Sequence, residues 1–430
     1  MKGLHRKKSG IPSVGQTSFT ALVTVILGAL AGVIVGRVLG PHGRGGYAIA
    51  TVAPVLFGIV GTLGVEEAIV YLAARTDDPR TIGYLIWGSL LLALALGSIA
   101  SAASIAFQFL LFWKPTLGVS KVLFITMACQ PLMFALTQVS CAHLRAQARY
   151  TTWNALRILV SLIYLVGLVV VIAASRLTIN AAILCLVIAS ASVMIASMLS
   201  VCFSHRPSTS PAEMKRLLSY GWKNHLITVQ TYANFQVDQV FLAGLVPAAQ
   251  LGQYAIAVTY ASAGISLGSA PALQLYSHFS RQGHPDRAAY RHLIIRTMLL
   301  LAGICVISAV LAPFFIPLVF GRSYSPAVAP ALILILSAPL LSLGATFSAI
   351  WKSAGKPLVA AKAQGIGLVV TLVTLPPAII YLGIDGAALV SIVVYAVVAA
   401  WLWRSNPFDG LLAARETSQP LGIRDRRLDT

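Results

Sequence analysis

The stretch "GGYAIA" (residues 45–50) recurs as "GQYAIA" (residues 252–257), with five of the six letters identical. The two copies lie 207 residues apart, the difference between positions 45 and 252, which is close to half of the 430-residue chain. The same offset places Arg145 on Lys352, in a loop well removed from the repeated phrase. Chance similarity between apolar stretches explains one match but not a shared offset, so we predict two structurally equivalent halves.

The composition around this repeat requires a membrane. Hydrophobic residues make up 58% of the chain and charged residues only 10%, and the mean hydropathy is +0.84. No water-soluble domain of this length has so apolar a surface, and a helix needs roughly 20 apolar residues to cross a bilayer core. The alternating pattern of a membrane β-barrel does not occur. We predict an all-α membrane protein with twelve spans, at about 14–36, 47–72, 82–106, 121–143, 153–174, 179–203, 225–246, 251–276, 293–319, 326–350, 361–382 and 385–403.

The distribution of positive charge predicts the orientation. With twelve spans, 25 of the 31 Lys and Arg residues fall on the side of the N-terminus and six on the other side. Positive residues are retained in the cytoplasm, so both termini are predicted to be cytoplasmic. The net charge of +19 then faces anionic lipid head groups, and we assign no role in nucleic-acid binding.

These spans predict five regions: a basic cytoplasmic tail (1–13), a six-helix lobe (14–203), a cytoplasmic linker (204–224), a second six-helix lobe (225–403) and a polar cytoplasmic tail (404–430). Six crossings are an even number, so the second lobe starts on the same side as the first. Such parallel repeats are related by an axis along the membrane normal. Rocking of the two bundles exposes the space between them to each side in turn.

Five stretches of the chain resemble a known family, in that family's order. They are "GRVLGPHGRGGYAIA" (36–50), "VDQVFLAGLVPAAQLGQYAIA" (237–257), "FGRSYSPAVAPALILI" (320–335), "KSAGKP" (352–357) and "LGIDGAAL" (382–389). They resemble bacterial oligosaccharide flippases of the polysaccharide biosynthesis branch of the multidrug/oligosaccharidyl-lipid/polysaccharide exporter superfamily. Sister branches export drugs or flip the peptidoglycan precursor, and the latter branch usually carries two additional helices.

The resemblance implies a flippase of the bacterial inner membrane that moves a polyprenyl-pyrophosphate-linked oligosaccharide outward for surface or exopolysaccharide synthesis. Partners implied are the lipid-linked glycan and a glycan polymerase or export machinery. A multidrug exporter of the same architecture is the alternative. A membrane glycan polymerase or ligase is less compatible, because its catalytic groups would need substantial outer loops. We therefore expect a transporter and not an enzyme.

Acids inside the predicted spans are candidates for a substrate or ion site, because a carboxylate in hydrocarbon costs roughly 2.5–3.5 kcal/mol on insertion scales. Asp238 continues a polar stripe with Asn234 and Thr231 at helical spacing. It either binds a coupling proton or sodium ion, organises a cationic substrate site, or holds its helix in place through a hydrogen bond. Glu66 and Glu67 point about 100° apart, and the offset places Glu67 on a polar residue, which favours Glu67 as the cavity-facing member; a snorkelling or paired side chain is the alternative.

Cations are needed to bind a pyrophosphate, and arginine suits phosphate oxygens because its planar fork donates two hydrogen bonds. Candidates for the lobe interface are Arg37, Arg157 and Arg296. Candidates for the first capture of a head group lie in equivalent cytoplasmic loops: Arg145, Arg149, Lys352 and Lys356. A purely topological role is the alternative for each of them. The five cysteines and eight histidines show no ligand spacing, so we expect no metal and no cofactor beyond a gradient ion.

Overall fold

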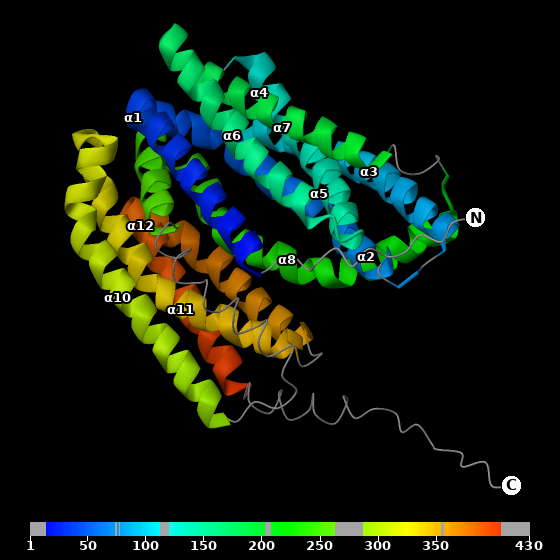
Figure 1. The fold of residues 1–430 in the computed structure, drawn as a ribbon. Coiled ribbons are helices and arrows are strands. Elements are labelled where there is room, and N and C mark those ends of the chain that lie inside the picture. The colour runs from blue at the N-terminus through cyan, green and yellow to red at the C-terminus, as the bar shows by residue number, and fades with distance from the viewer. Residues whose placement is uncertain are drawn as a thin grey trace, which may run out of the picture.

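A computed structural model describes residues 14–73, 75–76, 78–111, 120–202, 208–262, 287–353 and 357–405. Within these residues the chain is helical throughout and contains no strand (Figure 1). The predicted N-terminal tail, all but the first two residues of the predicted C-terminal tail and the end of the span predicted at 251–276 lie outside the described residues. The helices are α1 (Val14–Gly61), α2 (Val65–Ala73), α3 (Pro79–Leu111), α4 (Lys121–Ala128), α5 (Gln130–Ala146), α6 (Tyr150–Ala174), α7 (Ile179–Cys202), α8 (Pro211–Leu245), a helix at 248–262, α10 (Arg287–Phe320), η2 (Arg322–Ala327), α11 (Val328–Ser353) and α12 (Pro357–Arg404).

Eight helical segments of the described chain are long and apolar enough to cross a membrane. Two of them, Phe19–Ala73 and Leu358–Arg404, are 55 and 47 residues long, about twice the length of one crossing. Each contains a glycine with positive φ, Gly40 at 67° and Gly383 at 60°, where the chain turns between two predicted spans. With α8 and the helix at 248–262, these segments contain eleven of the predicted spans and the first half of the span predicted at 251–276, and the predicted fold class is confirmed.

Two predicted spans of the first lobe are interrupted. The second span breaks between α1 and α2, where Leu63 and Gly64 have φ values of 43° and 71°. The fourth span divides into α4 and α5 at Cys129, because Pro131 lacks an N–H and cannot continue the helix. The hydroxyl of Ser101 accepts from the Leu132 N–H and donates to the Cys129 carbonyl, at 3.1 and 3.3 Å. A neighbouring helix thus satisfies the freed backbone groups, as a hydrocarbon environment requires.

The linker predicted at 204–224 is largely helical, because α8 begins at Pro211 and not near residue 225. The first half of α8 packs on the first lobe, where Gly221 lies against Gly64 and the Tyr220 ring stacks on Tyr71 with centroids 4.1 Å apart. Its second half packs against α12 of the second lobe. One continuous helix therefore joins the two lobes.

The two copies of the repeated phrase begin at a mutual contact. A Cβ added to Gly45 would lie 1.7 Å from the Ala248 carbonyl oxygen, and one added to Gly252 would lie 2.0 Å from the Pro41 carbonyl oxygen. The offset of 207 residues maps Gly45 onto Gly252 and Pro41 onto Ala248, so each contact is the image of the other. This is the geometry of a two-fold axis between the halves. We call this end of the molecule the outer end, after the predicted orientation, and the opposite end the inner end.

The buried core is shared by the two lobes at the outer end and separate in each lobe at the inner end. At the outer end one cluster includes residues of both lobes, among them Tyr47, Phe124, Tyr254 and Ile384. At the inner end the core divides into a first-lobe cluster around Ile69, Leu85 and Leu217 and a second-lobe cluster around Phe347 and Trp351. Figure 1 shows the two lobes diverging in the same sense, with α10, α11 and α12 leaving the bundle that contains α3 and α5. The lobes are therefore sealed together at the outer end.

Candidate functional site

A cavity of about 560 Å³ lies between α5, α6 and α7 of the first lobe. Tyr232 of α8 also lines it, with 47% of its surface exposed. We call it the arginine cavity, because two guanidinium groups lie at one end. Its lining consists of Gln130, Met133, Phe134, Thr137, Gln138, Cys141, Arg145, Trp153, Leu156, Arg157, Val160, Ser190, Val193 and Tyr232. This list contains no acidic side chain from the described residues.

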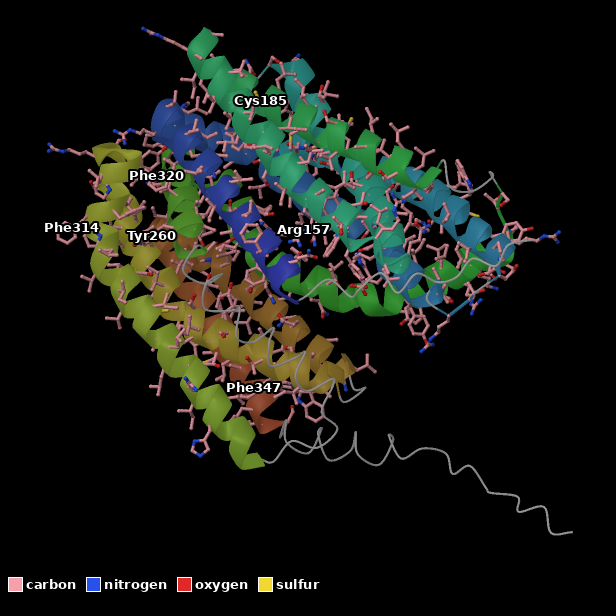
Figure 2. All side chains as sticks on the ribbon, viewed as in Figure 1. Arg157, Cys185, Tyr260, Phe314, Phe320 and Phe347 are labelled. Carbon is pink, nitrogen blue, oxygen red and sulfur yellow. The ribbon has the colours of Figure 1, made fainter. Side chains whose placement is uncertain are left out.

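The two arginines contact one aromatic ring. Arg145 ends α5 and Arg157 lies two turns into α6, so the tight turn at 147–149 brings them to the same end of the hairpin. The guanidinium carbons of Arg145 and Arg157 lie 5.6 and 5.0 Å from the centre of the Trp153 ring, within cation–π range. The Nε of Arg145 is buried and has no hydrogen-bond partner. Figure 2 shows Arg157 near the middle of the molecule, whereas Phe314 lies on the exposed side of α10.

The other end of the arginine cavity is polar but uncharged. Gln130 lies at the break before Pro131, and its Nε2 donates to the Ser190 Oγ at 2.6 Å. Its Oε1 is buried and has no partner. Thr137, about two turns further along α5 and midway to Arg145, donates its hydroxyl to the Met133 carbonyl at 2.7 Å. Hydroxyl and amide oxygens therefore line this end.

A second, much smaller cavity of about 10 Å³ lies between α8 and α12 in the second lobe, and Asp238 lines it. The Asp238 carboxylate accepts from the Tyr254 hydroxyl and, at 2.7 Å, from the Gln239 N–H. Asn234 donates to the Gln364 Oε1 at 3.1 Å. Other oxygen-bearing residues of the lining are Thr371, Ser391 and Tyr395. We call this the Asp238 pocket; it has room for about one water-sized particle.

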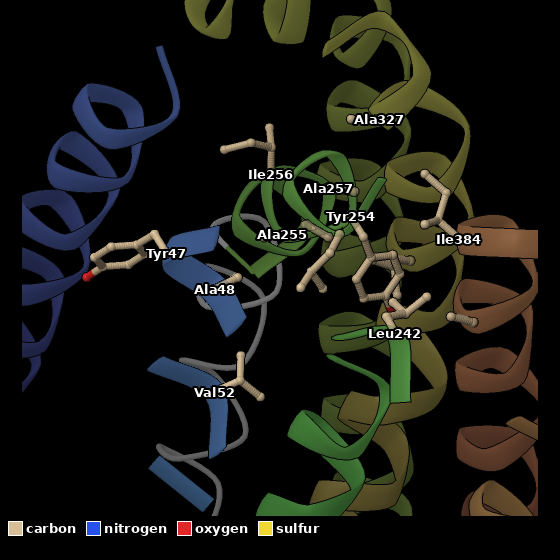
Figure 3. Close-up of a cluster of buried hydrophobic side chains, with 14 of the residues drawn as sticks. Tyr47, Ala48, Val52, Leu242, Tyr254, Ala255, Ile256, Ala257, Ala327 and Ile384 are labelled. Carbon is tan, nitrogen blue, oxygen red and sulfur yellow. The ribbon is translucent and has the colours of Figure 1, made fainter. Parts of the chain in front are cut away.

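The repeated phrase contributes to each lobe a tyrosine with a different partner. Tyr254 of the second copy meets Asp238, whereas the Tyr47 hydroxyl meets the Tyr164 hydroxyl at 2.9 Å. In Figure 3 the two tyrosines point away from each other, each into its own lobe. The offset maps Asp238 onto Ala31, so the first lobe lacks the carboxylate. The two halves are therefore alike in backbone and different in chemistry.

Glu66 and Glu67 lie outside both cavities. Glu66 is 8% exposed and accepts from the Thr62 hydroxyl at 3.1 Å, while its second carboxylate oxygen has no partner. Glu67 accepts from the Thr228 hydroxyl of α8 at 3.1 Å. Glu67, the member predicted to face a cavity, therefore contacts α8, the helix that joins the lobes. The side chain of Thr231 lies outside the described residues.

The remaining candidate cations are dispersed. Arg37 lies at the outer end and donates to the Leu318 and Val319 carbonyls at the end of α10, at 3.1 and 3.0 Å. Arg149 donates to the Ser200 carbonyl at 3.0 Å and so ties the α5–α6 turn to α7. Arg296 is exposed on α10. Lys356 and the side chain of Lys352 lie outside the described residues. Of the predicted cations, the structure brings together Arg145 and Arg157.

Several residues of these sites were not singled out from the sequence, among them Trp153, Gln130, Tyr232 and Tyr254. Trp153 precedes Arg157 by four positions, a spacing that places both on one helix face and could have indicated the pair. Tyr254 belongs to the repeated phrase itself. No sequence signal distinguished Gln130 or Tyr232 from other polar residues in apolar helices.

Comparisons with known proteins agree with this architecture. The model of a family described as "polysaccharide biosynthesis protein" matches residues 34–329. The chain is similar in structure to an inward-facing multidrug resistance MATE family transporter of the MOP superfamily, with 16% identity, a TM-score of 0.72 and coverage of 92% of this chain and 96% of that one. It is also similar to the lipid II flippase MurJ in an inward closed conformation, with 15% identity, a TM-score of 0.75 and coverage of 93% and 90%. For an outward-facing MATE transporter the values are 15%, 0.64, 94% and 96%. No curated protein matches the chain.

Proposed function

The chain belongs to the polysaccharide biosynthesis protein family, and from this premise we propose that it flips a glycan linked to a polyprenyl pyrophosphate across the bacterial inner membrane. The observation that carries the proposal is the arginine cavity, in which Arg145 and Arg157 both lie within cation–π range of Trp153. The fold is shared with a MATE family transporter of the MOP superfamily and with the lipid II flippase MurJ.

The electrostatics of the cavity favour an anionic ligand. Two guanidinium groups share one end of it, and no carboxylate of the described residues lines it. Both arginines are half-buried, so their charges attract a ligand that brings negative charge and repel an ammonium group. A diphosphate matches this end, since guanidinium–phosphate hydrogen bonds are charge-assisted and about twice as strong as neutral ones.

The outer seal supports a transport cycle that starts from the cytoplasm. The lobes meet at Gly45, Gly252 and Arg37, so the space between them is closed at the outer end. At the inner end the buried core is split into one cluster for each lobe. We propose that both termini are cytoplasmic and that the lipid-linked glycan is taken up from the inner leaflet. Rocking of the lobes would then break the outer contacts and release the glycan outside, to a polymerase or export machinery.

The Asp238 pocket is our candidate for energy coupling. It combines a carboxylate with amide and hydroxyl oxygens in a space for one small ion, the ligand type that hard cations prefer. We propose that a proton or sodium ion binds there and biases the second lobe between its two positions. Replacing Asp238 by Asn should abolish gradient-dependent export at a normal protein level. Unchanged export would assign Asp238 a packing role.

A multidrug exporter is the second candidate, because a MATE transporter shares the fold. Cationic drugs require acidic groups, and Glu66 and Glu67 line neither cavity while Asp238 is held by Tyr254. We therefore rank it below the flippase, and we infer transport and not a chemical reaction for the family member described here.

The deciding experiment removes one charge at a time from the α5–α6 hairpin. Arg145→Gln and Arg157→Gln should cause a carrier-linked glycan to accumulate on the cytoplasmic side of the membrane, measured by lipid extraction and mass spectrometry. Arg149→Gln is the matched control, because Arg149 lies on the same turn but points to the Ser200 carbonyl. If the first two variants export like the control, or if they only change drug resistance, the flippase assignment is wrong.

A further inference from the structure

Glu66 has a buried carboxylate that lines neither cavity. It lies in the first turn of α2 and is 8% exposed, and the Thr62 hydroxyl donates to its Oε1 at 3.1 Å. Its Oε2 is buried and has no hydrogen-bond partner. A buried carboxylate oxygen without a donor is energetically unfavourable, so it attracts any cation within reach.

The packing of α2 against α5 brings Glu66 close to the level of Arg145. Near the end of α1, a Cβ added to Gly58 would lie 3.4 Å from the Phe134 side chain of α5, so these two residues are level with each other. Both segments run toward the inner end, and eight residues further along each lie Glu66 and Ala142. Arg145 follows Ala142 by about one turn, and long helical side chains point back toward the N-terminus of their helix. The guanidinium group of Arg145 therefore extends toward the level of the Glu66 carboxylate.

Arg145 has the unpaired donor that matches this acceptor. Its Nε is buried and has no partner, while its guanidinium carbon lies 5.6 Å from the centre of the Trp153 ring in the arginine cavity. The Arg145 charge attracts the Glu66 carboxylate across the contact between α5 and α2. These two described residues form no hydrogen bond with each other through the Arg145 Nε or the Glu66 Oε2. Pairing with Glu66 is thus a second position for Arg145, distinct from the one at Trp153.

We propose that Glu66 competes with the bound diphosphate for Arg145 and so determines how readily the ligand is released. This proposal rests on the proposed function. With the diphosphate bound, Arg145 donates to phosphate oxygens in the arginine cavity. When the diphosphate leaves, Arg145 turns to the Glu66 Oε2, and its charge is compensated within the empty lobe. Glu66 is therefore a positioning residue, because it acts on the ligand through Arg145.

A competing carboxylate suits a transporter, because a transporter must release what it binds. Two guanidinium groups at one end of a cavity bind a diphosphate tightly, since their hydrogen bonds to phosphate are charge-assisted. An internal carboxylate that replaces the phosphate at one of them offsets the loss of those bonds and shortens the residence time of the ligand. Glu67 is not expected to share this role, because its carboxylate accepts from the Thr228 hydroxyl of α8.

The test measures binding and transport separately with the full-length protein. Farnesyl diphosphate is titrated calorimetrically into lipid nanodiscs that carry the wild type, Glu66→Gln or the matched control Glu67→Gln. We expect Glu66→Gln to bind this probe about tenfold more tightly than the wild type, because an uncharged amide no longer competes for Arg145. Glu67→Gln should bind like the wild type. In cells, Glu66→Gln should export glycan more slowly at a normal protein level, although it binds the probe more tightly.

A double variant shows whether Glu66 acts through Arg145. In the Arg145→Gln background, adding Glu66→Gln should leave the affinity for farnesyl diphosphate unchanged, because the residue for which the carboxylate competes is gone. Glu66→Asp keeps the charge but withdraws it by one methylene group, so its affinity should lie between those of the wild type and Glu66→Gln. This second variant keeps the test decisive if Glu66→Gln does not fold.

The outcomes separate the two proposals. The competition proposal is overturned, and the flippase assignment stands, if Glu66→Gln binds the probe no more tightly than the wild type or exports glycan at the wild-type rate. The same holds if Glu67→Gln gains as much affinity, or if the gain persists in the Arg145→Gln background. If farnesyl diphosphate does not bind the wild type, or binds Arg157→Gln equally well, the diphosphate site is wrong and the proposed function falls with it.

Discussion

The outer seal gives the sharpest prediction, because it depends on the absence of two Cβ atoms. In Gly45→Ala the new methyl group would lie 1.7 Å from the Ala248 carbonyl oxygen, and ordinary contact requires about 1.5 Å more separation. The Ala248 carbonyl oxygen belongs to the backbone of a packed helix and cannot rotate away as a side chain could. The clash therefore strains the contact between the lobes. Overpacking of this kind costs roughly 1–3 kcal/mol, which corresponds to a shift of about 5- to 150-fold away from the sealed state.

The shift is measurable as a distance between the lobes at the outer end. Ser175 follows α6, and Tyr381, which is 84% exposed, precedes the turn at Gly383, so spin labels at these positions report the separation by double electron–electron resonance. In a background without the five cysteines, Gly45→Ala should add a population at longer distance. Gly252→Ala should act in the same way, since its methyl group would lie 2.0 Å from the Pro41 carbonyl oxygen.

Gly28→Ala is the matched control. It lies in the same helix α1, and no atom lies within 4 Å of an added Cβ. It gains the helix propensity of alanine, up to about 1 kcal/mol, without a clash. If Gly45→Ala and Gly28→Ala give the same distance distribution, the contact does not hold the lobes together, and the two-fold seal loses its role in the transport cycle.

Three further predictions concern single contacts. Arg37→Ala should loosen the outer seal and lower the melting temperature in detergent, because the α10 carbonyls lose two charged hydrogen bonds; an unchanged melting temperature would contradict this. Ser101→Ala should destabilise the fold by about 0.5–1.5 kcal/mol per lost hydrogen bond, since the Leu132 N–H and the Cys129 carbonyl then keep only their bond to each other; chemical unfolding in mixed micelles measures the loss, and Ser98→Ala on the exposed side of the same helix is the comparison. Hydrogen bonds from the Thr81 hydroxyl and from two backbone N–H groups hold the pKa of the Asp78 carboxyl below its ordinary value, so its stabilisation of α3 is complete above about pH 4 and is lost as the pH falls through the lowered pKa. Thr81→Val should raise the pKa of Asp78 in a carboxyl-carbon NMR titration, and an unchanged pKa would refute the assignment.

Local sequence features predicted the architecture well, because the constraints behind them are local. A crossing needs about 20 apolar residues, and the turns at Gly40 and Gly383 required residues that tolerate positive φ. The repeat was visible because its glycines cannot carry a side chain at the axis. The helix in the predicted linker could not be recognised, since a polar helix on the inner surface lacks the apolar signal that marked the spans.

The sites were harder to predict, because they depend on which helices meet. Asp238 was recognisable as a carboxylate in an apolar segment, but its partner Tyr254 comes from another helix. Arg145 and Arg157 were assigned separately to head-group capture and to the lobe interface, and the α5–α6 turn brings them to one ring. Arg37 had the right chemistry for a phosphate and is used instead at the end of α10. Residue type limits the candidates, and only packing between helices selects among them.

The contact between Gly45 and Gly252 also bears on the ancestry of the chain. A surface that maps onto itself is what two products of a single gene form when they dimerise, so the chain has the form of a dimer whose subunits were later fused by α8. Fusion frees twin positions to diverge, because a mutation no longer appears twice in the assembly. Tyr47 and Tyr254 illustrate the result: one gene half could acquire a carboxylate beside its tyrosine while the other kept an uncharged pair.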